Sequence, residues 1–426
     1  MRMASSIAPP LSPWRAGAWA HVSVVDALKG LARVLLAAFI FFACFAFSET
    51  SPYDVVAIPT ILLWLCLGLR LHRGVVPLVG LLILYVTSVV AALVPHLDEP
   101  FPVTWTLQLA YLAVTGTFFA MLFSDETESR MELALKAYTA SCLLSAVFGI
   151  VGYFGFIPQE DLFYKYGRAS GTFTDPNVFG SFLTLGALYL MHGLLTGTAR
   201  RPVLALCALL ILVVAIFLSF SRGSWGGSLV ATLVMVGAIY RSSRSPTLRR
   251  RILVLTALAF VGGAVAIAGV FAIGDTAETF AKRAAVTQDY DQGETGRFGN
   301  QLRGMGMLIE EPLGMGPVRW RRTFGLEPHN SYIGSFANGG WLGGIVFLGL
   351  VLSTSFVGFR LISVESPFRR HAQIVWPALL MFFLQAVQID IEKWRHVYMM
   401  LGMIWALEAA RLNWLAAGDD RMAEGS

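Results

Sequence analysis

Long apolar segments recur along the whole chain, and they constrain its fold more than any other feature. Runs of about 20 apolar residues follow one another, mostly with short polar links between them. A helix of about 20 residues can cross the roughly 30 Å hydrocarbon layer of a bilayer. The chain is 56% hydrophobic and only 14% charged, whereas a soluble domain has roughly 25% charged residues. The sequence therefore predicts an all-α, polytopic membrane protein.

We predict twelve membrane-spanning helices and one large loop. The predicted spans are residues 31–48, 54–71, 74–94, 102–123, 132–154, 177–195, 202–220, 224–240, 252–273, 335–358, 373–391 and 395–411. Residues 274–330 form the only long polar stretch between spans, and we expect short helices there. We expect residues 1–30 to be a cytoplasmic N-terminal tail, residues 31–411 the transmembrane domain, and residues 412–426 a cytoplasmic C-terminal tail.

The distribution of basic residues predicts the orientation. If the N-terminus is inside, the inner segments hold 20 of the 32 Lys and Arg residues and the outer segments hold 12, seven of them in the long loop. Basic residues in short loops favour the cytoplasmic side. Both termini are therefore expected in the cytoplasm and the long loop outside. Topology explains the net charge of +5, so we do not interpret it as a nucleic-acid-binding signal.

The first polar motif of the outer side reads Arg168-Ala-Ser-Gly-Thr-Phe-Thr-Asp-Pro-Asn177. Asp175, Pro176 and Asn177 form a helix-start signal, because Pro fits the first turn and Asp or Asn caps free N–H groups. A helix N-terminus also favours an anion. The motif is either a simple capped turn or, with Arg168, part of an anion site.

The second motif is a very short link, Ser219-Phe-Ser-Arg222-Gly-Ser-Trp-Gly, between two apolar spans. A charge in such a tight hairpin lies close to the bilayer boundary. Arg222 is therefore either an interfacial residue beside Trp225 or a residue that faces a polar site. The nearby glycines allow close helix packing.

The third motif is the long loop. Asp275 and Thr276 can start a short helix through Thr287, and a second helix is expected from about Thr295 to Glu311. Arg297 lies in the second helix. The apolar residues of that helix recur at three and four, so one face is expected to lie on the membrane domain; they are Phe298, Leu302, Met305 and Leu308.

The end of the long loop carries further candidates. Arg321 lies in a basic pair, and His329 and Asn330 precede the next span. His329 is the strongest candidate for a general base, because the unperturbed pKa of histidine lies near neutrality.

Two other polar groups have competing interpretations. Asp289-Tyr290-Asp291 resembles a metal-binding D-x-D motif, but without a surrounding α/β domain we interpret it as solvated loop. Four residues at the outer end of the eleventh span either bind sugar hydroxyls or pair with Lys393 and Arg395, and pairing is slightly favoured. They are Gln385, Gln388, Asp390 and Glu392.

Taken together, these motifs resemble the bacterial O-antigen ligase and polymerase superfamily. The matching elements are Arg168-x-x-Gly-Thr-Phe-x-Asp-Pro-Asn, Phe-Ser-Arg222-Gly, Arg297 followed by Glu-Pro-Leu-Gly-x-Gly, and His329-Asn330-x-Tyr. Their order and the large outward loop before the tenth span also match. The motifs cover roughly residues 160–350, and the layout covers the whole chain.

The resemblance implies an inverting glycosyltransferase, independent of metal and other cofactors, at the periplasmic face of the bacterial inner membrane. Its donor is a glycan on undecaprenyl pyrophosphate, and its acceptor is either another glycan or lipid A core. Membrane lipids and a chain-length regulator are further candidate partners. By the same resemblance, Arg168 and Arg222 bind pyrophosphate, and His329 is the base or orients the acceptor. The remaining substrate-binding candidates are Arg297, Asn330, Asn177 and Arg321.

Three alternatives stay open. The chain is either a polymerase of surface polysaccharide repeat units, which we favour slightly, or an O-antigen ligase that transfers the glycan to lipid A core. Transfer to protein has no specific signal in the sequence. A transporter or flippase would show internal repeats and ionisable groups at mid-membrane; we find no repeat, and the ionisable residues cluster at span ends.

Overall fold

The computed structural model describes residues 24–47, 51–157, 162–271, 293 and 296–424. Its helices are α1 (Val24–Phe41), η1 (Phe42–Cys44), α2 (Pro52–Cys66), η2 (Arg73–Val75), α3 (Val76–Leu93), η3 (Val94–His96), α4 (Pro100–Ser124), α5 (Thr127–Tyr153), α6 (Pro176–Thr196), α7 (Pro202–Leu218), α8 (Arg222–Ser242), α9 (Pro246–Phe271), α11 (Arg297–Glu310), α12 (Trp320–Phe324), α13 (Ser331–Ser363), α14 (Arg369–Gln385) and α15 (Arg395–Glu424). Within the described residues, the sheet is an antiparallel hairpin of strands β1 (Tyr164–Lys165) and β2 (Arg168–Ala169).

The predicted spans coincide with the long helices. Twelve helices in the described part of the chain have 15 residues or more, and each overlaps one predicted span. Seven of the described helices are long and apolar enough to cross a membrane, and α2 and α7 are shorter apolar helices. The prediction of an all-α, polytopic membrane protein is confirmed. At the chain ends the helices extend beyond the predicted spans, since α1 begins at Val24 and α15 continues to Glu424.

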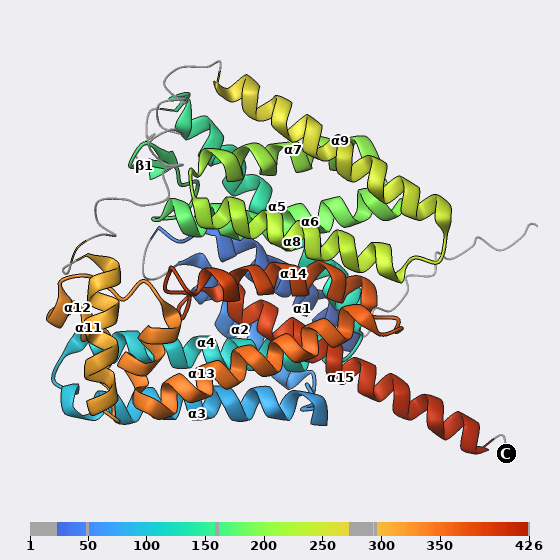
Figure 1. Ribbon diagram of the computed structural model, residues 1–426. Helices are drawn as coiled ribbons and strands as arrows, with labels where there is room; N and C mark the ends of the chain where they lie inside the picture. Colours follow the sequence, from blue (N-terminus) through green and yellow to red (C-terminus); the bar gives the residue numbers. More distant parts are fainter. Residues whose placement is uncertain (1–23, 48–50, 158–161, 272–292, 294–295, 425–426) are drawn as a thin grey trace, which may run out of the picture.

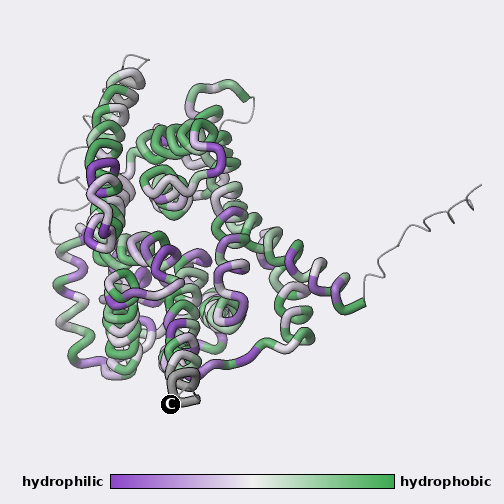
Figure 2. Tube along the Cα trace, turned by 90° about the vertical axis from the view of Figure 1, so that its right-hand side faces the viewer, coloured by the Kyte–Doolittle hydropathy of each residue, from purple (hydrophilic) through white to green (hydrophobic). Residues whose placement is uncertain are grey.

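Figure 1 shows most of the long helices lying side by side across the view. Helices α11 and α12 and the β1–β2 hairpin gather at one end of this bundle, which we call the α11 end; the opposite end is the far end. The starts of α6, α8, α13 and α15 all lie at the α11 end. Figure 2 faces the far end, and there hydrophobic residues dominate along the helices while hydrophilic residues occupy several helix ends and connections.

Small residues let the central helices approach each other closely. Helices α4 and α15 pack along each other, and a Cβ atom added at Gly402 of α15 would lie 2.6 Å from the carbonyl oxygen of Gly116 on α4. Phe119 of α4 also stacks on Phe39 of α1, with ring centroids 5.3 Å apart. Close van der Waals packing of this kind drives helix association in lipid, where no hydrophobic force acts between helices.

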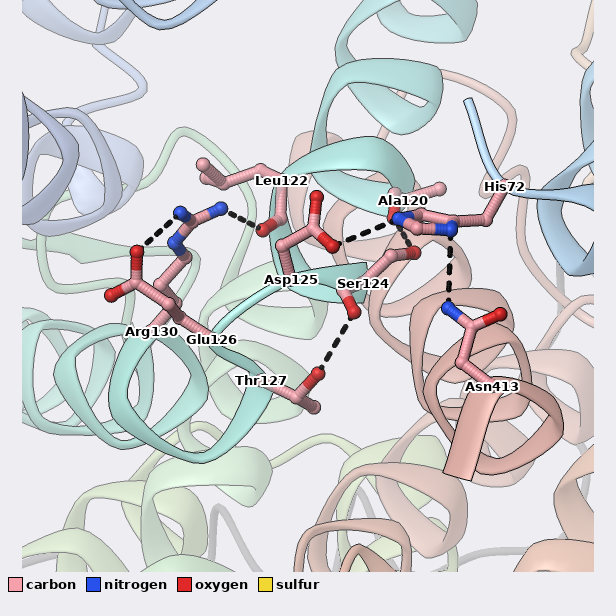
Figure 3. A network of polar contacts seen from close by, with 9 residues as sticks. All are labelled: His72, Ala120, Leu122, Ser124, Asp125, Glu126, Thr127, Arg130 and Asn413. Carbon is pink, nitrogen blue, oxygen red and sulfur yellow. Dashed lines mark hydrogen bonds and ion pairs between the residues drawn. The ribbon is translucent and has the colours of Figure 1, made fainter. Parts of the chain in front are cut away.

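A polar network closes the far end (Figure 3). His72, which lies between α2 and α3, places Nε2 2.9 Å from Asp125 Oδ1 and Nδ1 3.1 Å from Asn413 Nδ2 on α15. Arg130 of α5 donates a hydrogen bond to the carbonyl oxygen of Leu122 at 2.8 Å. The network therefore ties two interhelical connections to α15, on the side of the molecule away from α11.

A buried carboxylate also stabilises the far half of α15. Glu408 is only 2% exposed. It accepts two hydrogen bonds from Arg411, at 2.7 and 3.0 Å, and forms an ion pair with Arg360 of α13 at 2.6 Å. A buried charge is stable only when it is paired in this way.

Helix α13 breaks at Gly340, whose φ of 66° and ψ of −164° are not helical. The break separates residues 331–339 from residues 341–363, and the second segment alone is long enough to cross a bilayer. A Cβ atom at Gly340 would lie 2.4 Å from the carbonyl oxygen of Pro312, which accepts the N–H of Trp341 at 2.9 Å. Only glycine fits both the backbone angle and the space.

Helix α11, predicted from about Thr295 to Glu311, spans Arg297–Glu310, but its predicted contact face is wrong. Of the apolar row, only Leu308 is buried, at 6% exposure. The other three residues are exposed by 45% or more; they are Phe298, Leu302 and Met305. The first helix predicted in the long loop, from Asp275 to Thr287, lies outside the described residues.

A different face of α11 contacts the bundle. Its buried residues are Asn300, Gly304 and Leu308. A Cβ atom at Gly304 would lie 1.9 Å from the ring of Trp320, and Asn300 Nδ2 donates to the carbonyl oxygen of Phe324 at 3.3 Å. The indole of α12 therefore packs directly on the α11 backbone, and it displaces the more apolar face from the interface.

Candidate functional site

The β1–β2 hairpin places Arg168 at the α11 end of the bundle. Its turn contains Tyr166 and Gly167, with φ of 55° and 75°. The Arg168 side chain is buried, and it donates hydrogen bonds from Nε to the carbonyl oxygen of Ser219 and from Nη2 to Asn177 Oδ1, both at 2.7 Å. One guanidinium thus connects the hairpin with the end of α7 and the start of α6.

The predicted helix start at Asp175 is present in α6. Asp175 caps the helix by accepting the N–H of Asn177 at 2.7 Å, and Pro176 occupies the first turn. The Asn177 side chain remains available to bind Arg168. Ser224 of α8 donates to the carbonyl oxygen of Asn177 at 3.1 Å, which joins the starts of α6 and α8.

Arg222 is the first residue of α8. The N-cap Ser221 accepts the N–H of Ser224 at 3.2 Å, and Phe220 takes a positive φ of 44° in the tight α7–α8 hairpin. Trp225 donates Nε1 to carbonyl oxygens at the end of α7, 3.0 and 3.2 Å away. The indole N–H is therefore satisfied inside the protein rather than at a lipid head group.

Arg297 is the first residue of α11. Its Nη1 lies 3.4 Å from the carbonyl oxygen of Gln388, in the connection between α14 and α15. Its guanidinium also lies over the ring of Phe298, 4.7 Å from the centroid. The start of α11 is in this way attached to the α14–α15 connection.

These side chains meet at one cavity of about 110 Å³, which we call the arginine cavity. It is lined by Arg168, Arg222 and Arg297. The other lining residues are Asn177, Ser181, Phe220, Ser221, Gly223, Gln385, Gln388 and Ile389. Guanidinium groups stay charged and bind phosphate oxygens in bidentate pairs. The arrangement therefore favours a polyanion such as a pyrophosphate.

Two glutamines from the end of α14 complete the wall. Gln385 is buried and accepts a hydrogen bond from Ser181 at 2.9 Å, and its Nε2 has no partner within the described part of the chain. Gln388 approaches the α8 backbone so closely that a Cβ atom at Gly223 would lie 2.9 Å from its Nε2. Their amides suit sugar hydroxyls, the interpretation slightly disfavoured from the sequence. The sequence signal for this role was the position of the two glutamines, three residues apart at the end of an apolar span.

His329 is held beside this cavity by Asp390. Its Nδ1 lies 3.5 Å from Asp390 Oδ2, and its backbone N–H donates to the same oxygen at 3.2 Å. His329 has a positive φ of 44°. Asn330 donates its N–H to Asp390 Oδ1 at 3.0 Å, and its side chain caps α13 by accepting two backbone N–H groups. One carboxylate therefore fixes the whole start of α13.

The same carboxylate sets the protonation of the imidazole. The hydrogen bond that Asp390 accepts from the imidazole raises the pKa of His329 above its ordinary value, although partial burial and the charge of Arg297 lower it. A histidine paired through Nδ1 has its tautomer fixed and presents Nε2 for proton transfer. The side chain is 43% exposed, so a substrate can reach it.

His329 does not line the arginine cavity, but its neighbours connect it to that cavity. Arg297, which lines the cavity, binds the carbonyl oxygen of Gln388, two residues before Asp390. The structure thus brings Arg168, Arg222 and Arg297 together and places the His329–Asp390 pair next to Arg297. Asp390, which the sequence did not single out as the partner of His329, completes this group.

Arg321 does not join the site. Its side chain is 67% exposed and lies 4.0 Å from Glu327. The neighbouring Arg319 and Arg322 both pair with Glu99, before α4. The basic cluster of the loop therefore attaches α12 to the bundle instead of lining the cavity. Asp289 and Asp291 lie outside the described residues.

Glu392 is a buried acid close to the site. Burial, together with the nearby Asp390 charge, raises the pKa of Glu392 to about 8. Glu392 and Asp390 do not neutralise Arg395, which pairs instead with Asp54 of α2 at 2.7 Å. The predicted pairing of these two acids with Arg395 is therefore wrong, because α2 supplies its own carboxylate at this point.

Comparison with known proteins agrees with the motifs. Residues 207–348 match the family model described as O-Antigen ligase. This part of the chain is therefore similar to the O-antigen ligase family. The match includes Arg222, Arg297 and His329, and it confirms the resemblance to the O-antigen ligase and polymerase superfamily. The family indicates a glycosyltransferase-like ligase or polymerase in surface polysaccharide assembly. No curated protein and no solved structure matched the chain.

Proposed function

We propose that this protein is an inverting glycosyltransferase that extends a surface polysaccharide at the periplasmic face of the inner membrane. Its donor is a glycan linked to undecaprenyl pyrophosphate, and its acceptor is the sugar end of another lipid-linked repeat unit. Both termini then lie in the cytoplasm, and the α11 end faces the periplasm. The bias of Lys and Arg toward the inner segments supports this orientation.

One observation carries the proposal: three arginines from separate segments line a single small cavity beside a histidine–aspartate pair. A pyrophosphate leaving group develops negative charge as its bond to the sugar breaks. Fixed guanidinium groups stabilise that charge in a water-poor site, and such preorganised electrostatics is usually the largest catalytic term. Arg168 is held by two protein acceptors and needs no reorganisation as the charge develops.

The His329–Asp390 pair supports the acceptor half of the reaction. An acceptor hydroxyl forms a bond to the anomeric carbon from the face opposite the pyrophosphate. The C–O bond to the pyrophosphate breaks, its electron pair passes to the leaving phosphate oxygen, and the hydroxyl proton passes to His329 Nε2. Asp390 stabilises the imidazolium so formed through Nδ1. Attack from the opposite face inverts the anomeric configuration.

A transfer assay tests the proposal. The full chain is reconstituted in lipid with undecaprenyl-pyrophosphate-linked repeat units, with or without lipid A core, and products are separated by size. We expect glycan chains to lengthen without lipid A core. We expect His329→Ala to lower the rate by about 10²–10⁴-fold, the usual effect of losing a general base.

Arg244→Ala is the matched control, because Arg244 is 86% exposed near the start of α9, far from the cavity. It should retain the wild-type rate. Product formed only with lipid A core would replace the polymerase assignment with a ligase. A folded protein that transfers glycan to neither acceptor would refute the glycosyltransferase proposal and favour transport.

A further inference from the structure

A second, larger cavity opens at the α11 end of the bundle, on the other side of the α6 start. It measures about 760 Å³. Thr174 and Val178 of the α6 start line this cavity, whereas Asn177 and Ser181 line the arginine cavity. The first turns of α6 therefore separate the two. We call the larger one the α2–α4 cavity, because Ile58 of α2 and Leu107 of α4 form part of its wall.

The mouth of the α2–α4 cavity is cationic. Lys393 and Arg395 line it together with one acid, Asp54, which pairs with Arg395 at 2.7 Å. Lys393 is exposed and donates to Gln108 of α4 at 2.8 Å. The cavity lining thus brings together two basic side chains and one acid. Two basic groups at one opening favour an anionic head group of modest size.

Below this mouth the wall becomes apolar and continues toward the far end. A third cavity, of about 440 Å³, lies deeper between α2, α3 and α4. On α2, Ile58 lines the outer cavity, and Ile61 and Leu65 line the deeper one. On α4, Leu107 lines the outer cavity and Val114 lines the deeper one. These positions are three, four and seven apart, so they share helix faces. Except for Ile61, which is half-buried, their side chains are at least half exposed, so the path is open to lipid.

The catalytic group lies between the two cavities. The α14–α15 connection supplies Gln388 to the arginine cavity and Lys393 to the α2–α4 cavity, and Asp390 between them holds His329. Burial raises the pKa of Glu327, and the charges of His329 and Lys393 both lower it, which places these groups near one another. A sugar attached to a head group at Lys393 can therefore extend toward His329.

We propose that the α2–α4 cavity and the groove below it bind the carrier lipid of the acceptor. The ligand is an amphiphile with a phosphate head group at Lys393 and Arg395 and a single long isoprenoid chain along α2 and α4. This rests on the proposed function and adds a second lipid site to it, separate from the donor site. We choose a single-chain carrier because one continuous apolar groove accepts one hydrocarbon chain.

Lipid stoichiometry tests the site without requiring activity. The full chain in detergent is titrated with undecaprenyl phosphate, and bound lipids are counted by native mass spectrometry. We expect two lipids on the wild type and one on the double variant Lys393→Gln/Leu107→Trp, which removes the cation and fills the groove. Undecaprenol and inorganic phosphate, added separately, should not occupy the second site at the same concentration.

The matched control is the double variant Lys136→Gln/Leu204→Trp. Lys136 is an exposed cation on α5, and Leu204 is an exposed apolar residue of α7 that lines none of these cavities. The control should keep two lipids. Equal stoichiometry in the wild type and the groove variant would overturn the proposal, and so would undecaprenol or inorganic phosphate occupying the second site.

Two-substrate kinetics separate this proposal from the proposed function. Lys393→Gln should raise the KM of the lipid-linked acceptor by about tenfold, the effect of losing one charged hydrogen bond, and leave the KM of the donor unchanged. Wild-type protein that binds two lipids but transfers no glycan would refute the proposed function and keep the second site. A change in the KM of the donor alone would refute the second site.

Discussion

The three arginines of the cavity differ in how far their side chains are exposed. Arg168 is buried and makes two short hydrogen bonds to Ser219 and Asn177, so replacing it would disturb the fold as well as the cavity. Arg222 starts a helix, is partly exposed and lines the cavity. Arg222 is therefore the better residue for separating binding from folding.

Replacing Arg222 with lysine keeps the charge and removes the planar, two-pronged donor. We expect Arg222→Lys to lower kcat/KM for the lipid-linked donor by roughly 10- to 100-fold, since one charged hydrogen bond contributes about 1.5–3 kcal/mol. Steady-state kinetics at saturating acceptor measure this. Arg244→Lys, at an exposed site far from the cavity, is the control, and an equal loss in both variants would contradict the assignment.

The pH profile tests the His329–Asp390 pair. Because Asp390 raises the pKa of His329, the imidazole stays protonated to a higher pH and can act as a base only above it. Activity should therefore fall as the pH decreases through this raised pKa. Asp390→Asn removes the raising charge and keeps an oxygen for one of the two backbone N–H groups, so the acidic limb should move to lower pH. An unchanged limb would exclude His329 as the titrating base.

The sequence predicted the candidate site residues better than it predicted which residues they contact. Arg168, Arg222 and His329 were each suggested by position at a span end and by the family resemblance. That Asp390 holds His329, and that Arg321 stays outside the cavity, depends on how the long loop folds onto α13 and α4. No local spacing encodes such contacts between distant segments.

At the scale of elements, α11 depends on one close approach. Trp320 packs so tightly on Gly304 that a Cβ atom there would lie 1.9 Å from its ring. Gly304→Ala should separate α11 from α12, shift Arg297 at the start of the helix, and lower transfer activity by tenfold or more, on the order of a 1–3 kcal/mol overpacking penalty. Faster hydrogen exchange in residues 297–310 would report the loosening.

Gly306→Ala provides the matched control on the same helix. A Cβ atom at Gly306 meets nothing within 4 Å, and alanine stabilises an exposed helix by roughly 0.5–1 kcal/mol relative to glycine. This variant should keep activity and slow exchange. If the two alanine variants behaved alike, the packing of Trp320 would not be what positions α11.

The positions of the helices could be predicted from the length of the apolar runs, but the faces by which the helices contact each other could not. Each long apolar run became a helix, because a backbone in lipid must satisfy its own hydrogen bonds. The contact face of α11 was wrong, because a glycine that admits Trp320 outweighs the more apolar row. The break in α13 was not foreseen either, because Gly340 lies within a continuous apolar run and its positive φ reflects the Pro312 turn packed against it.

At the scale of the whole molecule, the α11 end carries the arginine cavity and the His329–Asp390 pair, and the far end carries the buried Glu408 with its two arginines. Glu408→Ala would leave two arginines around a buried site and should destabilise the fold by about 3–5 kcal/mol. We expect a lower Tm in detergent and an unchanged KM for the donor in protein that remains folded. A change in KM without a change in Tm would contradict this division.

Glu365→Ala is the control for that change, since Glu365 is 66% exposed and pairs with the exposed Arg244. An exposed ion pair contributes about 0–1 kcal/mol, so its removal should leave Tm almost unchanged. The difference in Tm between Glu408→Ala and Glu365→Ala therefore separates the effect of losing a buried ion pair from that of losing an exposed one.

The last turns of α15 project from the far end, away from both cavities (Figure 1). From Leu412 to Ala417 its side chains are exposed, while the preceding half of the helix is buried in the bundle. A helical protein fused in register to this end would be carried as a rigid extension, adding mass outside the detergent belt. Such a fusion would give electron microscopy a feature for particle alignment, and it would not block the arginine cavity or the α2–α4 cavity.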